Sequence, residues 1–182
     1  RGGGSPDTVS QSSSRGPTDD NRIKPDIIAP GAYVRSCLSQ DATDTSGGSV
    51  QTGGWYIEYS GTSMATPNAA GSAALIREYI LEIAQRPAPQ GALVKALLVL
   101  GARDLGNRDI PNNDEGWGRI DLQNTLAPSD RGIWVDDRSV LSGTGNVKTY
   151  TFNVTTSGQP FKAVLCWSDE RGSRFSTNQL VN

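Results

Sequence analysis

Histidine is absent from all 182 residues of the chain. Imidazole is the general base of Ser-His-Asp and Cys-His catalysis, so this chain cannot supply that machinery by itself. The same absence excludes every metal site that uses a histidine ligand. Long apolar runs are missing too. The longest, Ala92–Val94 and Ala96–Leu100, fall far short of the ~20 residues that span a bilayer, so we expect no membrane span.

Charge is nearly balanced, with 17 Lys and Arg against 19 Asp and Glu, and the pI is about 5.1. This balance gives no electrostatic argument for a nucleic-acid or acidic-lipid partner. Cysteine is scarce, and Cys37 and Cys166 are open to two interpretations, one disulfide or two free thiols. The chain opens Arg-Gly-Gly-Gly-Ser, without the apolar segment of a signal peptide, and it stops abruptly. We interpret both ends as cuts in a longer protein.

The strongest helical pattern begins within a few residues of Ser63 and ends near Gln85. Its early turns are small on nearly every side, which predicts that neighbours pack closely around the first half. Charged residues in the later turns predict that the second half emerges into water. Pro67 is expected in the first turn, where a missing N–H costs little. The apolar stripe repeats at spacings of four, three, four and three residues: Ala69, Ala73, Ile76, Ile80 and Ile83.

Shorter patterns flank this helix. Residues 92–100 predict a second helix, and residues 122–126 predict a short helical segment. Residues 27–29 and 55–59 predict strands, and residues 39–54 form a long polar loop.

The composition of the sequence changes beyond a linker at residues 128–132. Residues 133–141, 147–154 and 161–167 are rich in β-forming side chains and predict antiparallel strands. Three strands without a second layer are marginal on their own. We therefore interpret residues 133–182 as the start of a β-sandwich whose remainder is absent.

The motif that carries chemistry is Gly61-Thr62-Ser63-Met64-Ala65-Thr66-Pro67, between a predicted strand and the main helix. A helix N-terminus has free N–H groups and partial positive charge, which would stabilise negative charge on a carbonyl oxygen attacked by Ser63. The Ser63 N–H would be one donor of an oxyanion hole. Ser and Thr are also favoured helix caps, so on physical grounds alone a simple cap at Thr62 or Ser63 is the better interpretation.

That motif, followed by Ala70-Gly71, resembles the catalytic-serine signature of the subtilisin-like serine proteases, the subtilases. Segments 13–17 and 24–31 resemble the family's loop and strand before the serine. Segments 94–98 and 116–121 resemble its segments after the serine. The tail, with Val164-Leu165-Cys166-Trp167-Ser168-Asp169 and Leu180-Val181-Asn182, looks like the start of the C-terminal β-jelly-roll domain of one branch.

The resemblance implies a two-part chain. Residues 1–127 would be the C-terminal portion of a three-layer α/β subtilisin-like domain, and residues 133–182 would begin a jelly-roll-like sandwich. It also implies a secreted or extracytoplasmic endopeptidase that cleaves polypeptides. The partner of this chain would be the missing N-terminal portion of the same protease.

The site roles follow from the same resemblance. Ser63 would be the nucleophile that forms an acyl-enzyme, with Gly61, Thr62 and Met64 lining the oxyanion and substrate region. The family's Asp, His and oxyanion Asn would lie before Arg1, so we expect the isolated chain to be inactive. Asn68 stands where the family usually has a His that is not part of the triad.

Several alternatives remain open. A pseudoprotease or interaction module could keep this fold without the chemistry. An esterase of the α/β-hydrolase type fits poorly, because Ala65 replaces the final Gly of the Gly-x-Ser-x-Gly elbow and no His follows. No cofactor is needed for the chemistry and no metal ligands are assigned. Structural Ca²⁺ is conceivable, although solvated loop charges are the better interpretation of the loop carboxylates Asp19, Asp20, Asp41 and Asp44, as of Asp169 and Glu170. Asn153 fits a glycosylation sequon.

Overall fold

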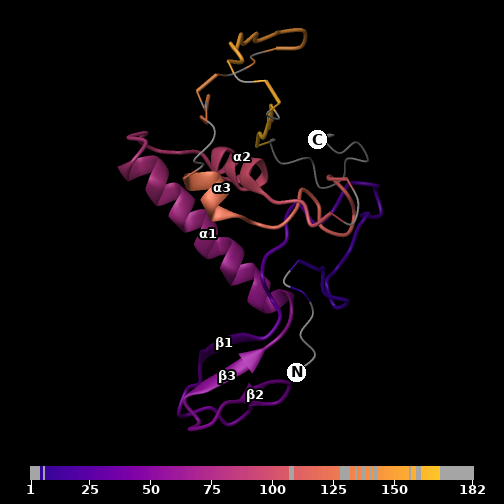
Figure 1. The fold of residues 1–182 in the computed structure, drawn as a ribbon, viewed down its shortest axis with the longest axis vertical. Helices are drawn as coiled ribbons and strands as arrows, with labels where there is room; N and C mark the ends of the chain where they lie inside the picture. The colour runs from indigo at the N-terminus through magenta and orange to yellow at the C-terminus, as the bar shows by residue number, and fades with distance from the viewer. Residues whose placement is uncertain are drawn as a thin grey trace.

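A computed structural model describes residues 5, 7–106, 109–127, 132–133, 135–136, 138–139, 141, 143–155, 157–158 and 161–168. One long helix, α1 (Thr62–Glu82), links the parts of the molecule. A small sheet lies beyond its N-terminal end, and two further helices lie against its C-terminal half (Figure 1). In the described part of the chain, no helix is long and apolar enough to cross a membrane.

The sheet has three antiparallel strands in the order β1-β3-β2, namely β1 (Val34–Cys37), β2 (Ser49–Val50) and β3 (Tyr56–Tyr59). The strand predicted at residues 55–59 is confirmed as β3. Val34 stands opposite Tyr59 in the register, and Ser49 stands opposite Glu58. The long polar loop contains β2, so it folds back onto β3. The sheet buries only Ile57, and its role is to lead the chain directly into the first turn of α1.

The core lies where α2 (Gly91–Gly101) and α3 (Leu122–Leu126) pack on the second half of α1. Both helices predicted from the sequence are confirmed within a residue of their expected bounds. Asp121 caps α3 by accepting a hydrogen bond from the Asn124 N–H at 3.0 Å. The buried core side chains are Ile76, Ile80, Leu93, Leu97 and Leu98.

The burial predicted for the first half of α1 is wrong, whereas the predicted exposure of the charged residues in the second half is confirmed for Arg77, Glu78 and Glu82. Ala70 and Gly71 in the first half are exposed, as is Ala74 just beyond the middle, and the buried residues are Ile76 and Ile80. The reason is that α2 and α3 cover one face of the second half, and no other described segment covers the small residues of the first half. Small side chains permit close packing, but they do not supply the neighbour that packs.

Pro67 also differs from expectation, because it is the sixth residue of α1 rather than a first-turn residue. Proline has no N–H, so the helical hydrogen bond that would end on the Ser63 carbonyl is missing.

Residues 27–29 form a single parallel bridge, Ile28 with Arg119, rather than the strand that was predicted. Nearby, Gly116 has a φ of +61°, and a β-carbon there would lie 2.0 Å from the Pro25 carbonyl oxygen. Only glycine permits this approach. The Trp117 N–H donates to the Asp26 carbonyl at 2.8 Å, so the segments around residues 26 and 116 are joined.

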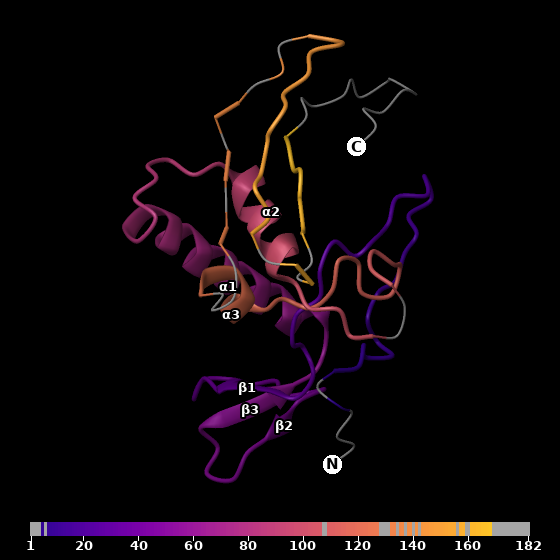
Figure 2. The same ribbon diagram turned by 45° about the horizontal axis from the view of Figure 1, so that its top comes forward.

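The tail differs from the predicted sandwich. No strand forms in the described residues between 132 and 168, so the three predicted strands are wrong there. Extended stretches do run side by side, as Figure 2 shows, and the rings of Phe152 and Phe161 lie 5.4 Å apart. Extended chain without a covering layer lacks the apolar burial that stabilises a sheet. Residues 128–131 and 169–182, including Asp169, Glu170 and the last three residues, lie outside the described residues.

The two cysteines are free thiols, with Cys37 exposed on β1 and Cys166 half-buried in the tail. Burial raises the pKa of the Cys166 thiol.

Helices and one small antiparallel sheet make up the described fold, and the predicted three-layer arrangement of the subtilisin-like domain stays a prediction.

Candidate active site

The first turn of α1 presents Ser63 to solvent. The N-cap is Gly61, and the helix has no side-chain capping bond. Gly61 has a φ of +154°, which side chains rarely adopt. Thr62 and Ser63 are the first and second residues inside the helix. The simple capping interpretation of these two residues is therefore wrong, because a glycine occupies the cap.

The polar groups of this turn are available to a ligand. The Gly61 carbonyl accepts from the N–H groups of Met64 and Ala65 at 3.1 and 3.3 Å. The Ser63 hydroxyl and the Ser63 N–H, in contrast, have no hydrogen-bond partner among the described residues. The first turn carries no acidic residue. The turn thus offers a hydroxyl nucleophile and a free donor at the positive end of a helix of 21 residues.

Residues 30–33 fix this turn from one side. The Gly61 N–H donates to the Gly31 carbonyl at 2.7 Å, and the Tyr33 N–H donates to the Ser60 hydroxyl at 2.8 Å. The amide nitrogen of Asn68 donates to the Pro30 carbonyl at 2.7 Å. The sequence did not predict these contacts. The sequence has no signal for which carbonyl a distant amide will meet.

Met64 and Thr66 complete the surroundings of Ser63. Met64 is half-buried, and its sulfur lies 4.0 Å from the position that a β-carbon would take at Gly61. The Thr66 hydroxyl donates back to the Thr62 carbonyl at 2.9 Å within the helix. Gly61, Thr62, Ser63 and Met64 are consecutive in the sequence, and the structure places all four at the start of α1.

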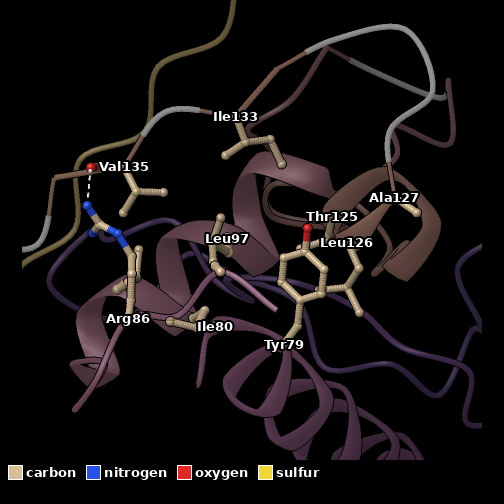
Figure 3. A pocket seen from close by; sticks show the side chains of 11 residues that line it. Tyr79, Ile80, Arg86, Leu97, Thr125, Leu126, Ala127, Ile133 and Val135 are labelled. Atoms are coloured by element: carbon tan, nitrogen blue, oxygen red, sulfur yellow. Dashed lines mark hydrogen bonds between the residues drawn. The ribbon is translucent and has the colours of Figure 1, made fainter. Parts of the chain in front are cut away.

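The apolar pocket of the molecule lies elsewhere (Figure 3). It has a volume of about 390 Å³ and opens between the second half of α1, α2, α3 and the side chains of Ile133 and Val135. Tyr79, which lines it, is sixteen residues beyond Ser63, or roughly 24 Å along a helix. Arg86 closes one side by donating to the Val135 carbonyl at 3.2 Å. This pocket is too far from Ser63 to be the place where the serine would act.

Comparison with known proteins decides the family. Residues 4–118 match the sequence profile of the subtilase family, which is more than half of the chain. The chain belongs to the subtilase family.

Its relatives are proteases by name. The subtilase chain is 33% identical over 144 residues to the serine protease/ABC transporter B family protein tagB of Dictyostelium discoideum, covering 63% of this chain and 8% of tagB. It is 40% identical over 121 residues to serine protease AprX of Bacillus subtilis, covering 66% of this chain and 26% of AprX. Among solved structures, the CspB protease of Clostridium perfringens superposes with a TM-score of 0.52 at 31% identity, over 65% of this chain and 23% of CspB.

These matches also show a difference in length. The subtilase chain spans only 8% and 26% of the two curated relatives. The activity of a whole subtilase is therefore a matter for proposal here.

The loop carboxylates of the subtilase do not gather. The pKa of Asp20 is lowered by hydrogen bonds from the Thr18 hydroxyl and from Arg22, and the pKa of Asp44 is lowered by the Ser46 N–H. In the described ranges, no group of three or more His, Cys, Asp or Glu side chains is placed to hold a metal ion.

Proposed function

We propose that this chain is the nucleophile-bearing portion of a serine endopeptidase, with Ser63 as the residue that attacks the peptide carbonyl. The observation that carries the proposal is the exposed Ser63 inside the first turn of α1, with its hydroxyl and its N–H unpartnered among the described residues. Membership of the subtilase family gives that geometry its chemical meaning.

In the proposed reaction, the Ser63 oxygen bonds to the substrate carbonyl carbon while its proton passes to a general base. The oxyanion that forms lies at the positive end of α1, where the Ser63 N–H donates to it. Collapse of this intermediate breaks the C–N bond while the protonated base gives its proton to the leaving nitrogen, which releases the amine and leaves an acyl group on Ser63. Water then releases the acyl group. Thr62, Gly61 and Met64 line the place where the substrate backbone approaches.

The base is not in this chain, because no residue of it is a histidine. We propose that another portion of the same protease brings the Asp, the His and a second oxyanion donor, and that the chain alone is inactive. The exposed small residues Ala70, Gly71 and Ala74 support this division, since they form an uncovered face next to the turn that holds Ser63.

Two further parts of the proposal rest on the resemblance, and the second also has the support of a sequence pattern. The protease would be secreted or extracytoplasmic. Residues 133–182 would begin a jelly-roll-like sandwich that is completed by residues beyond this chain. The alternation of Tyr150, Phe152 and Val154 with threonines is the feature that favours the sandwich.

The test begins with the source transcript upstream of Arg1. The proposal expects an Asp at a strand end, then a His opening a helix, then an Asn. The protein of that full reading frame should hydrolyse peptides, and Ser63→Ala should lower kcat by at least about 10³-fold. Ser72→Ala, two turns further along α1, is the matched control and should retain activity.

Two outcomes would count against the proposal. A frame that lacks the His or the Asp would favour the pseudoprotease. Hydrolysis by the purified 182-residue chain, lost in Ser63→Ala, would contradict the predicted inactivity of the chain alone.

A further inference from the structure

We propose that Asn68 is a positioning residue, whose side-chain amide holds residues 30–31 against α1 and thereby fixes the turn that carries Ser63. The catalytic part of this inference rests on the proposed function, while its geometric part does not.

Two consecutive carbonyls, those of Pro30 and Gly31, are held by the start of the helix. The Pro30 carbonyl accepts from the Asn68 amide nitrogen at 2.7 Å, and the Gly31 carbonyl accepts from the Gly61 N–H at 2.7 Å. Gly61 is the N-cap, two residues before Ser63. Because both of these adjacent carbonyls are held, neither peptide group can rotate independently of the other. Asn68 therefore acts on Ser63 through Gly31 and Gly61.

Residues 30–31 pack closely against the start of α1. A β-carbon at Gly31 would lie 2.7 Å from the Gly61 carbonyl oxygen and 2.9 Å from the Ala65 β-carbon. Backbone that is packed this closely transmits a small displacement directly to its neighbour. A shift of residues 30–31 therefore moves Gly61, and with it the free N–H and hydroxyl of Ser63.

The chemistry of the clamp requires a side chain that donates. The Pro30 carbonyl is an acceptor, so the amide nitrogen of Asn68 meets it, and a carboxylate at the same place would repel it. Asn68 lies on the second turn of α1, within reach of residues 30–31 on the flank of the helix.

The surroundings of Asn68 keep its effect local. The side chain is exposed at the edge of an open hollow of about 440 Å³, lined also by Pro30 and Ser72. Replacing it opens no buried cavity, and water can hydrate the freed Pro30 carbonyl. The hydrogen bond from the Tyr33 N–H to the Ser60 hydroxyl stays in place. Loss of the Asn68 side chain should therefore loosen the contact between residues 30–31 and α1 without unfolding the molecule.

Amide hydrogen exchange on the complete 182-residue chain tests the geometry without any need for activity. In Asn68→Ala and Asn68→Asp, the Gly61 amide should exchange about 2- to 13-fold faster, the range expected for one lost hydrogen bond. Amides of α2 should keep their rates. Asn68→His, which restores a donor, should recover most of the protection. Ser72 lines the same hollow and has no hydrogen bond to Pro30, so Ser72→Ala should leave the exchange rate of the Gly61 amide unchanged.

Two results would overturn the inference. Unchanged Gly61 exchange in both Asn68→Ala and Asn68→Asp would mean that the Asn68 amide does not hold residues 30–31 against α1. Alternatively, all amides could accelerate together, which would make Asn68 a general stabilising residue.

The full-length protease supplies the catalytic readout. Asn68→Ala and Asn68→Asp should lower kcat about tenfold with KM nearly constant, because a misplaced nucleophile and oxyanion donor affect the transition state and not substrate binding. Asn68→His should recover kcat. A full-length protein without Ser63-dependent hydrolysis contradicts the proposed function, whereas unchanged kcat in an active protein contradicts the role of Asn68.

Discussion

Residues 5–127 and residues 132–168 have similar shares of apolar residues, but among the described residues only the first part forms a core. In the first part, Ile76 is fully buried and Ile80 is 3% exposed. In the second, Val147 is 83% exposed and Leu165 is 80% exposed. The difference lies in the partners, because α1, α2 and α3 cover one another while the extended tail has no second layer.

The border between the two parts is itself anchored. Ile133 and Val135 pack on the core cluster, and Arg138 donates to the Pro87 carbonyl at 2.8 Å. The tail thus begins on the helical core and leaves it within a few residues. This comparison teaches that an apolar sequence is stabilised only to the extent that a neighbouring element removes it from water.

The largest difference in stability loss between the two parts should come from replacing a glycine by alanine. Gly116→Ala should lower the free energy of unfolding by about 3–5 kcal/mol, because its φ of +61° is strained for alanine and the new β-carbon would meet the Pro25 carbonyl oxygen. Urea unfolding followed by far-ultraviolet circular dichroism measures the change. In the tail, the β-carbon of Gly143→Ala would make only an ordinary contact with the Asn146 side-chain nitrogen at 3.7 Å, and stability should change by less than about 0.5 kcal/mol. Equal effects of the two substitutions would remove the distinction between the parts.

Leucine should give an intermediate difference. Leu97→Ala removes a buried side chain from between α1 and α3 and should cost about 2–4 kcal/mol of unfolding free energy. Leu165→Ala, at a position 80% exposed, is the control and should stay within about 0.5 kcal/mol. Thermal unfolding of both variants measures this contrast. A large loss in Leu165→Ala would show that the tail is buried in solution.

The smallest effect concerns the ordered contact at the start of the tail. Hydrogen bonds from the Ser139 hydroxyl and the Tyr150 hydroxyl hold the pKa of Asp136 well below its usual range. The same bond from Tyr150, 2.7 Å long, raises the pKa of the Tyr150 hydroxyl. A depressed pKa means that the contact is fully present above the ordinary pKa of Asp, about 3.9, and is lost only as the pH falls through the lowered value.

We therefore expect Asp136→Asn to lower the pKa of Tyr150 toward its ordinary value, as measured by nuclear magnetic resonance titration of the ring. Asp44→Asn changes a loop carboxylate of the first part that also has a lowered pKa, and it should leave Tyr150 unchanged. An unchanged Tyr150 pKa in Asp136→Asn would mean that this part of the tail does not hold its shape.

Local sequence patterns predicted the elements of the first part well. The apolar stripe predicted a helix that begins within a few residues of Ser63, and α1 begins at Thr62, while the leucine pattern placed α2. The motif at residues 61–67 pointed to the family, which the match over residues 4–118 shows. These features are local, since helix period and turn chemistry depend on neighbouring residues.

Features that depend on distant neighbours were predicted poorly. Small side chains at Ala70, Gly71 and Ala74 predicted a buried first half for α1, and those positions are exposed. Alternating residues in 149–155 predicted a strand, and no partner strand forms a ladder with them in the described tail. The cap at Gly61, chosen over Thr62 and Ser63, follows from a backbone angle that no pattern of side chains specifies.

The sequence by itself determined the helices, the turn that presents Ser63 and the absence of a histidine base, because each depends on residue identity or short spacing. The tertiary structure decided which half of α1 is covered and which carbonyl Asn68 meets, thirty-eight residues away in sequence. It also decided that the tail stays extended. The physical reason is that burial and long-range hydrogen bonds belong to pairs of surfaces, and a pattern along one segment specifies only one member of each pair.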